Sequence, residues 1–221
     1  MTAPMILPAS RRGLLGLLLA GVFLPARTRP GHAALPPDKA ELVRRVETYL
    51  NGVRTISARF NQVNPDGSFS SGSFHVDRGR ATMRFDYDPP SEILLIAPGD
   101  WRLIFADGTA RQVNVLPVGE TPLGFLLSKQ VRLEGGDEVA VTEATREKGE
   151  IVLALMRPSA PDQGRLRLAF VERPIEMRRW AVTDPQGLTT VVILEGMVLN
   201  KPIDPDVFVW RDPQIFGWPI Q

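Results

Sequence analysis

Short segments in which apolar and polar residues alternate dominate the chain from residue 56 onward. Alternation with a period of two puts successive side chains on opposite faces of a strand. Turn sequences such as Pro65-Asp66-Gly67 and Asp184-Pro185-Gln186-Gly187 separate the segments at intervals of about eight to twelve residues. The pattern therefore predicts an antiparallel meander of about eleven strands rather than a parallel sheet with helices. The predicted strands are Ile56–Val63, Ser68–Asp77, Thr82–Tyr87, Glu92–Ala97, Trp101–Ala106, Gln112–Leu116, Val139–Arg146, Ile151–Met156, Arg165–Val171, Glu176–Thr183 and Leu188–Val198.

Two helical segments interrupt this pattern. The first, Asp38–Leu50, has apolar residues at helical spacing, and Asn51-Gly52 is expected to close it. The second, Thr121–Ser128, is a short apolar turn that lies between predicted strands. The apolar side chains of such a turn are removed from water only if the turn covers an apolar surface, so we expect it to act as a lid.

The N-terminal residues are typical of an export signal. Arg11 and Arg12 precede the apolar run 13–24, which is about half as long as the roughly 20 residues that a membrane-spanning helix needs. We expect residues 1–33 to be a cleaved signal peptide, either of the general secretory type or of the twin-arginine type, and residues 34–221 to form a single domain. The protein would then lie outside the cytoplasm.

Composition narrows the choice of partners. Four of the 26 basic residues precede Ala34, which leaves 22 basic against 25 acidic residues in the expected mature chain. This slightly negative balance favours neither nucleic acid nor an anionic membrane as a partner. Cysteine is absent, so the fold has no disulfide, and the protein itself cannot carry the cysteine-linked lipid of a bacterial lipoprotein.

Candidates for chemistry are few. His75 lies inside a predicted strand, and Asp86 and Asp88 alternate with aromatic residues, which is typical of the solvent face of a half-buried strand. The loop Gly135-Gly136-Asp137-Glu138 has too few oxygen ligands for calcium. No nucleophile elbow, zinc motif or phosphate-binding loop occurs. We therefore predict no catalytic residue, no metal site and no cofactor.

Arg78 stands apart in this otherwise unreactive region. It follows a predicted strand and precedes another, in a turn. It is either an ordinary exposed turn arginine or a residue whose planar fork of donors binds the backbone carbonyls of a movable segment over a cavity.

The order of motifs resembles the LolA-type outer-membrane lipoprotein carriers of Gram-negative bacteria. The matching features are Phe60-Asn61-Gln62, Gly72 in the next strand, Arg78 before Met83-Arg84-Phe85-Asp86-Tyr87-Asp88-Pro89-Pro90, then Thr121-Pro122-Leu123, Asp184-Pro185-Gln186-Gly187-Leu188-Thr189, Asn200 and Phe208. They span nearly the whole expected mature chain, and the ordered set is more specific than any single member.

The resemblance implies a fold and a role. The fold would be mainly β, an unclosed antiparallel half-barrel with an N-terminal helix and a short helical lid over an apolar concave face. The role would be that of a monomeric periplasmic carrier, which takes acylated lipoproteins from an inner-membrane ATP-binding-cassette release complex to an outer-membrane acceptor.

The resemblance also implies roles for particular residues. Arg78 matches an arginine that holds the lid shut, and Met83 stands close to the place of an aromatic residue needed for handover of cargo. The expected cavity residues are Met83, Phe60, Phe74, Phe85, Leu123, Phe125 and Leu126.

Three other functions stay open at this point. The same half-barrel could carry a different lipid, or act as an envelope sensor, although such sensors have a further domain for which this chain has no room. An enzyme acting on an envelope lipid or glycan would need a catalytic cluster of Asp, Glu and Ser alone. For the carrier, we expect Arg78→Leu to weaken the closed state and to slow release of cargo.

Overall fold

Strands form most of the described chain. The computed structural model describes residues 35–121, 124–136, 139–162 and 164–218, so the predicted signal peptide lies outside the described residues. All eleven predicted strands are confirmed to within one residue at either end. They are β1 (Thr55–Val63), β2 (Phe69–Asp77), β3 (Thr82–Tyr87), β4 (Ile93–Pro98), β5 (Arg102–Asp107), β6 (Gln112–Pro117), β7 (Ala140–Glu147), β8 (Glu150–Met156), β9 (Arg165–Glu172), β10 (Ile175–Thr183) and β11 (Thr189–Leu199).

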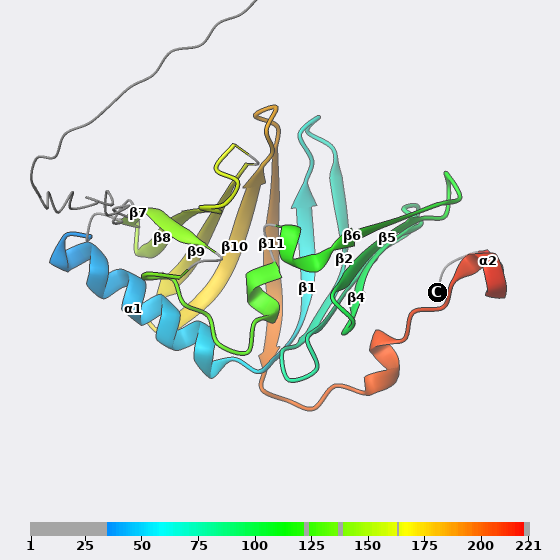
Figure 1. The fold of residues 1–221 in the computed structure, drawn as a ribbon, viewed down its shortest axis with the longest axis horizontal. Helices are drawn as coiled ribbons and strands as arrows, with labels where there is room; N and C mark the ends of the chain where they lie inside the picture. The colour runs from blue at the N-terminus through cyan, green and yellow to red at the C-terminus, as the bar shows by residue number, and fades with distance from the viewer. Residues whose placement is uncertain (1–34, 122–123, 137–138, 163, 219–221) are drawn as a thin grey trace, which may run out of the picture. The chain divides into compact units, whose positions relative to one another are not determined.

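The strands form one open sheet in the order β6-β5-β4-β3-β2-β1-β11-β10-β9-β8-β7 (Figure 1). Every neighbouring pair is antiparallel. Neighbours in the sheet are neighbours in the chain except at the centre, where β1 pairs with β11. The prediction of an unclosed, mainly β half-barrel is therefore confirmed.

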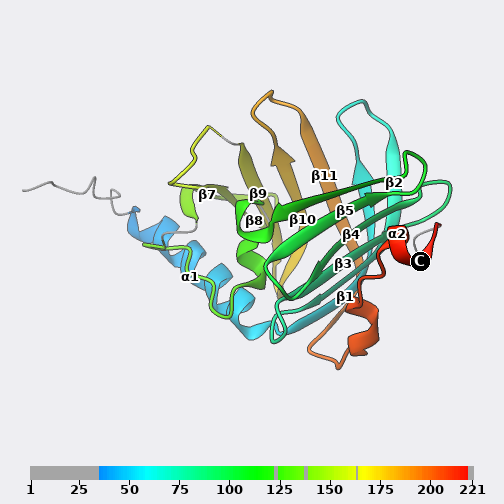
Figure 2. The same cartoon turned by 45° about the vertical axis from the view of Figure 1, so that its right-hand side comes forward.

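The two edge strands run in the same direction, because neighbours alternate and eleven strands separate into two arms around β1 and β11. No antiparallel ladder can join β6 to β7, so the chain has to return across the sheet between them. Residues 118–139 make this return, and we call them the crossover. The crossover contains the 3₁₀ helices η1 (Val118–Glu120) and η2 (Gly124–Leu127), which lie between the two arms (Figure 2).

The main core lies on one face of the sheet. In β1 the alternate residues Ile56, Ala58 and Phe60 are buried, as period two requires. Phe74 of β2 is fully buried and stacks on Phe85 of β3, with ring centroids 4.4 Å apart. Trp180 of β10 contacts both rings, at 5.6 and 6.1 Å. Aromatic pairs at these distances contribute about 0.5–1.5 kcal/mol each beyond the area that they bury.

Helix α1 (Pro37–Gly52) covers the arm that contains β7 and β10 (Figure 1). Its buried stripe, which includes Leu42, Val43, Val46 and Leu50, has the helical spacing seen in the sequence. The helix continues to Gly52, two residues beyond the predicted end at Leu50, and it also ends in a different way. Gly52 has no positive φ and the C-cap is an extended Val53, so no left-handed glycine closes the helix.

The C-terminal segment covers the opposite face of the sheet. It contains η3 (Pro205–Phe208) and the single turn α2 (Pro213–Phe216), whose first amides donate to the side chains of Asp204 and Asp212. Trp210 packs there on a small cluster that belongs to β4 and β5. Within the described ranges, no helix has the length and apolarity to cross a membrane.

Candidate functional site

The crossover buries an apolar turn over the core. Phe125, Leu126 and Leu127 of η2 are each only 5% exposed, and they belong to the same continuous cluster as Phe60 and Trp180. This turn is the short helical lid that the sequence predicted, in a 3₁₀ rather than an α conformation. Leu123, which we also expected here, lies outside the described residues.

Arg78 holds the end of this turn. It lies in the turn between β2 and β3, and its Nε and Nη2 both donate to the carbonyl oxygen of Ser128, the former at 3.1 Å. Its Nη1 donates to the carbonyl oxygens of Leu50 and Val53, the latter at 3.0 Å. One guanidinium therefore ties the crossover, the end of α1 and the start of the sheet together.

The charge of Arg78 is buried among carbonyl groups. The residue is only 7% exposed, and none of the ion pairs among the described residues includes it. The carbonyl of Leu50 lies at the negative end of the α1 dipole, which favours a cation. Burial lowers the pKa of the Arg78 guanidinium, but an arginine stays protonated in proteins. Arg78 is thus a buried residue that binds backbone carbonyls, not an exposed turn arginine.

The crossover beyond η2 runs along α1. The side chain of Asn51 accepts from the amide of Val131 at 2.8 Å and donates to its carbonyl at 2.9 Å. The Glu47 carboxylate accepts from the amide of Leu133 at 2.7 Å. Val131 and Leu133 are buried. This half of the crossover is therefore fixed to the helix by both polar and apolar contacts.

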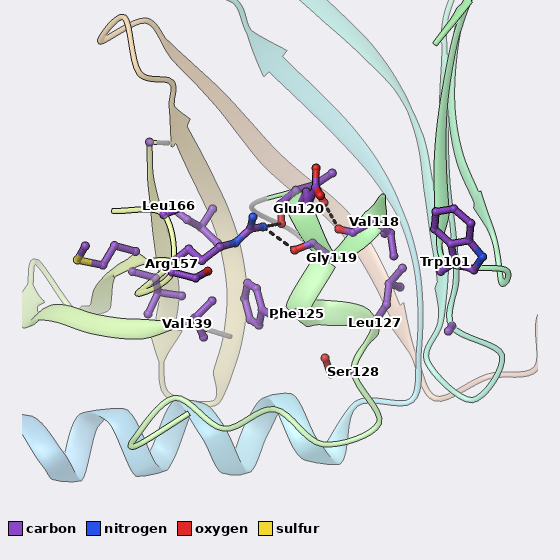
Figure 3. A pocket seen from close by; sticks show the side chains of 18 of the residues that line it. Trp101, Val118, Gly119, Glu120, Phe125, Leu127, Ser128, Val139, Arg157 and Leu166 are labelled. Atoms are coloured by element: carbon purple, nitrogen blue, oxygen red, sulfur yellow. Dashed lines mark hydrogen bonds between the residues drawn. The ribbon is translucent and has the colours of Figure 1, made fainter. Parts of the chain in front are cut away.

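A second arginine holds the other end of the crossover. Arg157, which directly follows β8, donates through Nη2 to the carbonyl oxygens of Gly119 at 2.6 Å and Thr121 at 3.3 Å (Figure 3). Sequence reasoning missed this residue, because nothing local distinguishes it from other arginines. η2 thus lies between two arginine contacts, one from each arm of the sheet.

A cavity of about 820 Å³ opens beside the lid. Its apolar wall includes Phe125, Leu127, Val139, Leu155 and Leu166. Figure 3 shows Trp101 and Arg157 on opposite sides of it.

Trp101 is the second residue that sequence reasoning missed as a site residue. It is 69% exposed, with φ at 66°. A bulky side chain in this left-handed conformation is unusual, and such residues concentrate at functional sites. The only signal in the sequence was its position after the turn Pro98-Gly99-Asp100.

The predicted cavity residues fall into two groups. Phe125 lines the cavity. The second group does not line the cavity but lies in the filled core. It consists of Phe60, Phe74, Phe85 and Met83, each at most 3% exposed, and the lid residue Leu126, which is 5% exposed. In this form of the protein the lid turn packs with the aromatic cluster, so contact between those side chains and a ligand remains a prediction about an open form.

The remaining polar candidates have structural partners. His75 lies 3.1 Å from the hydroxyl of Ser57, and burial lowers its pKa. Asp86 pairs with Arg84, and Asp88 pairs with Arg59. The described residues include no group of three or more His, Cys, Asp or Glu side chains that could hold a metal ion. Part of the loop 135–138 lies outside the described residues.

These features define an open β half-barrel protein with a lidded apolar cavity. Residues 51–211 match the family model described as outer membrane lipoprotein carrier protein LolA. The match spans most of the chain, and the protein belongs to this family.

Two relatives have the description of a lipoprotein carrier. The chain is 26% identical to an outer-membrane lipoprotein carrier protein of Pseudomonas aeruginosa over 207 residues, which cover 89% of this chain and 95% of the relative. It is 26% identical to one of Azotobacter vinelandii, over 82% of this chain and 90% of the relative. A solved LolA-superfamily structure from Nitrosomonas europaea is similar over 78% of this chain and 97% of its own, with 9% identity and a TM-score of 0.40.

Proposed function

We propose that this protein is a non-enzymatic periplasmic carrier of lipoproteins. It would take acylated lipoproteins from an inner-membrane ATP-binding-cassette release complex, shield their acyl chains, and deliver them to an acceptor at the outer membrane. The observation that carries the proposal is the lid. Three apolar side chains of one short turn cover the core of a half-barrel beside an apolar cavity, and two arginines hold the turn by its backbone. Membership of the carrier family supports the same role.

Energetics favour a lidded cavity for such cargo. Each acyl methylene transferred from water contributes roughly 0.8 kcal/mol, so a long chain needs cover throughout its passage. The same favourable free energy of burial opposes release of the cargo. In the closed form the lid side chains occupy the place that acyl chains would take, so closure competes with binding and offsets part of its free energy.

Arg78 would set the balance between the closed, empty form and the loaded form. Its bonds to Ser128 exist only when the lid is closed, so they stabilise the empty form at the expense of the loaded form. Met83 lies in the fully buried core below, and its flexible thioether suits a wall that repacks around different chains. We assign Met83 to the surface that cargo meets once the lid has opened.

A transfer assay tests the proposal. Purified Arg78→Leu protein loaded with a lipoprotein should hold it longer than the wild type after addition of outer-membrane vesicles, because the closed form is no longer favoured. Arg80→Leu is a matched control, since Arg80 lies in the same turn but pairs with Asp77 instead of the crossover. Equal transfer by all three proteins contradicts the role of Arg78. Failure of the wild type to bind any acylated protein contradicts the function itself.

A further inference from the structure

The two edges of the sheet differ in their protection. β7 has exposed charges at Glu143, Arg146 and Glu147, and its pairing with β8 shifts register between Val141 and Glu143. Helix α1 also packs against it. Charges, bulges and covering elements are the usual devices that stop an edge strand from pairing with another chain. By all three criteria, β7 is a protected edge.

β6 has none of these devices along most of its length. Its sequence, QVNVLP, contains no charged residue, and its pairing with β5 has no register shift. Among the described elements, its extensive contacts are with β5 alone. Proline occurs only at its last position. The outer edge of β6 therefore offers backbone donors and acceptors that no strand of the sheet uses.

The side chains of β6 are also suited to contact. Val115 and Leu116 are 50% and 51% exposed, and as consecutive residues of a strand they lie on opposite faces. A strand added along this edge would therefore contact an apolar side chain on each face of the sheet. An uncharged edge of this kind accepts an extended segment without charge selection.

The edge leads directly into the cavity. Val118 follows the last residue of β6, and its amide donates to the carbonyl of Trp101 at 2.7 Å. Both residues line the cavity. A ligand whose apolar part fills the cavity would therefore have its next atoms beside the C-terminal end of β6.

We propose that β6 binds the polypeptide segment directly after the acylated residue of the cargo, as an added β-strand. This inference rests on the proposed function and assigns a second part of the same site. A bacterial lipoprotein is acylated at its N-terminal cysteine, so its chain starts at the cavity and runs from the C-terminal towards the N-terminal end of β6. That direction is antiparallel to β6, which continues the pattern of the whole sheet. Main-chain bonds provide the affinity in this mode of recognition, so cargoes with different linker sequences would all be accepted.

Three synthetic probes test the proposal. The first is a diacylglyceryl-cysteine followed by six uncharged residues, the second is the same peptide with alternate backbone nitrogens methylated, and the third is the diacylglyceryl-cysteine amide without a peptide. Net contributions of about 0.5–1.5 kcal/mol per hydrogen bond predict that wild-type protein binds the first probe at least about tenfold more tightly than the other two. Isothermal titration calorimetry measures all three affinities, and the probe comparison needs no protein variant.

Variants locate the effect on the edge. Val115→Lys places a charge on β6 at an exposed position and should abolish the preference for the first probe while affinity for the third is kept. Thr142→Lys introduces the same charge at an exposed position of β7 and should leave the preference intact.

Each other outcome is decisive. Equal affinity of the wild type for all three probes overturns the edge site and leaves the carrier function standing. Binding of none of them overturns the carrier function. If Val115→Lys dissociates a dimer in sedimentation and leaves the probe preference unchanged, the edge belongs to a second copy of the chain and the proposal is wrong.

Discussion

Replacing Arg78 by leucine should open the lid selectively. In the closed form the carbonyl of Ser128 accepts from two nitrogens of this one guanidinium. Hydrogen bonds to charged groups contribute about 1.5–3 kcal/mol each, and counting the pair on one oxygen as a single such bond gives about 1.5–3 kcal/mol for the latch. At 1.36 kcal/mol per factor of ten, the population of the open lid should rise by about 10- to 150-fold.

Hydrogen exchange measures this population directly. The amide of Ser128 donates to Phe125 at 3.1 Å and that of Gly124 to Thr121 at 3.1 Å, so both become exchangeable only when the turn loosens. The exchange rates of these two amides should rise by about 10- to 150-fold in Arg78→Leu.

The variant also loses the bonds to Leu50 and Val53, which lowers global stability, so amides of β1 and β11 serve as an internal reference. Arg80→Leu should leave the ratio of lid to reference rates unchanged. If lid and reference amides accelerate equally in Arg78→Leu, the residue only stabilises the fold and the latch is refuted.

Three further predictions concern single residues. Arg157→Leu should speed exchange at Thr121 by about 2- to 10-fold, since this half-buried arginine makes contacts of about 0.5–1.5 kcal/mol; unchanged exchange would show that it does not restrain the lid. Gly72→Ala should lower the free energy of unfolding in urea by about 1–3 kcal/mol, because a Cβ there lies 2.0 Å from the carbonyl oxygen of Asp86; an unchanged urea midpoint would contradict this reasoning. Glu172 pairs with two arginines, one on α1, which lowers its pKa. Glu172→Gln should therefore destabilise the protein at pH values above about 4.3, the pKa of a glutamate in the unfolded chain. The urea midpoints of variant and wild type should converge as the pH falls below the lowered pKa of Glu172 in the folded protein. A difference between the two midpoints that persists at pH 2 would contradict the ionic origin.

The strand pattern was predictable because its causes are local. Period two and turn sequences act within a few residues, so β3, for example, begins and ends where the sequence placed it. The position of the lid followed in the same way from an apolar turn between strands. Arg78 was also found from its position in a turn, although its burial was not.

Contacts between distant segments were not predictable. Arg157 meets Gly119 and Thr121 only because the crossover, after it leaves β6, passes the end of β8, and no local pattern encodes that meeting. The role of Phe60 illustrates a second limit. Alternation shows that a side chain faces inward, but whether that interior is filled or hollow depends on where the crossover lies.

The number of strands has a consequence of its own. An up-and-down barrel with an even number of strands can close by antiparallel pairing all the way round, and it then has no edge strands. An odd number of strands leaves two edge strands that run in the same direction, so the crossover that connects them has to pass over the open side of the half-barrel. Gain or loss of a whole β-hairpin changes the number of strands by two, so the number stays odd. Such a change would widen or narrow the half-barrel and still leave a crossover between its two edges.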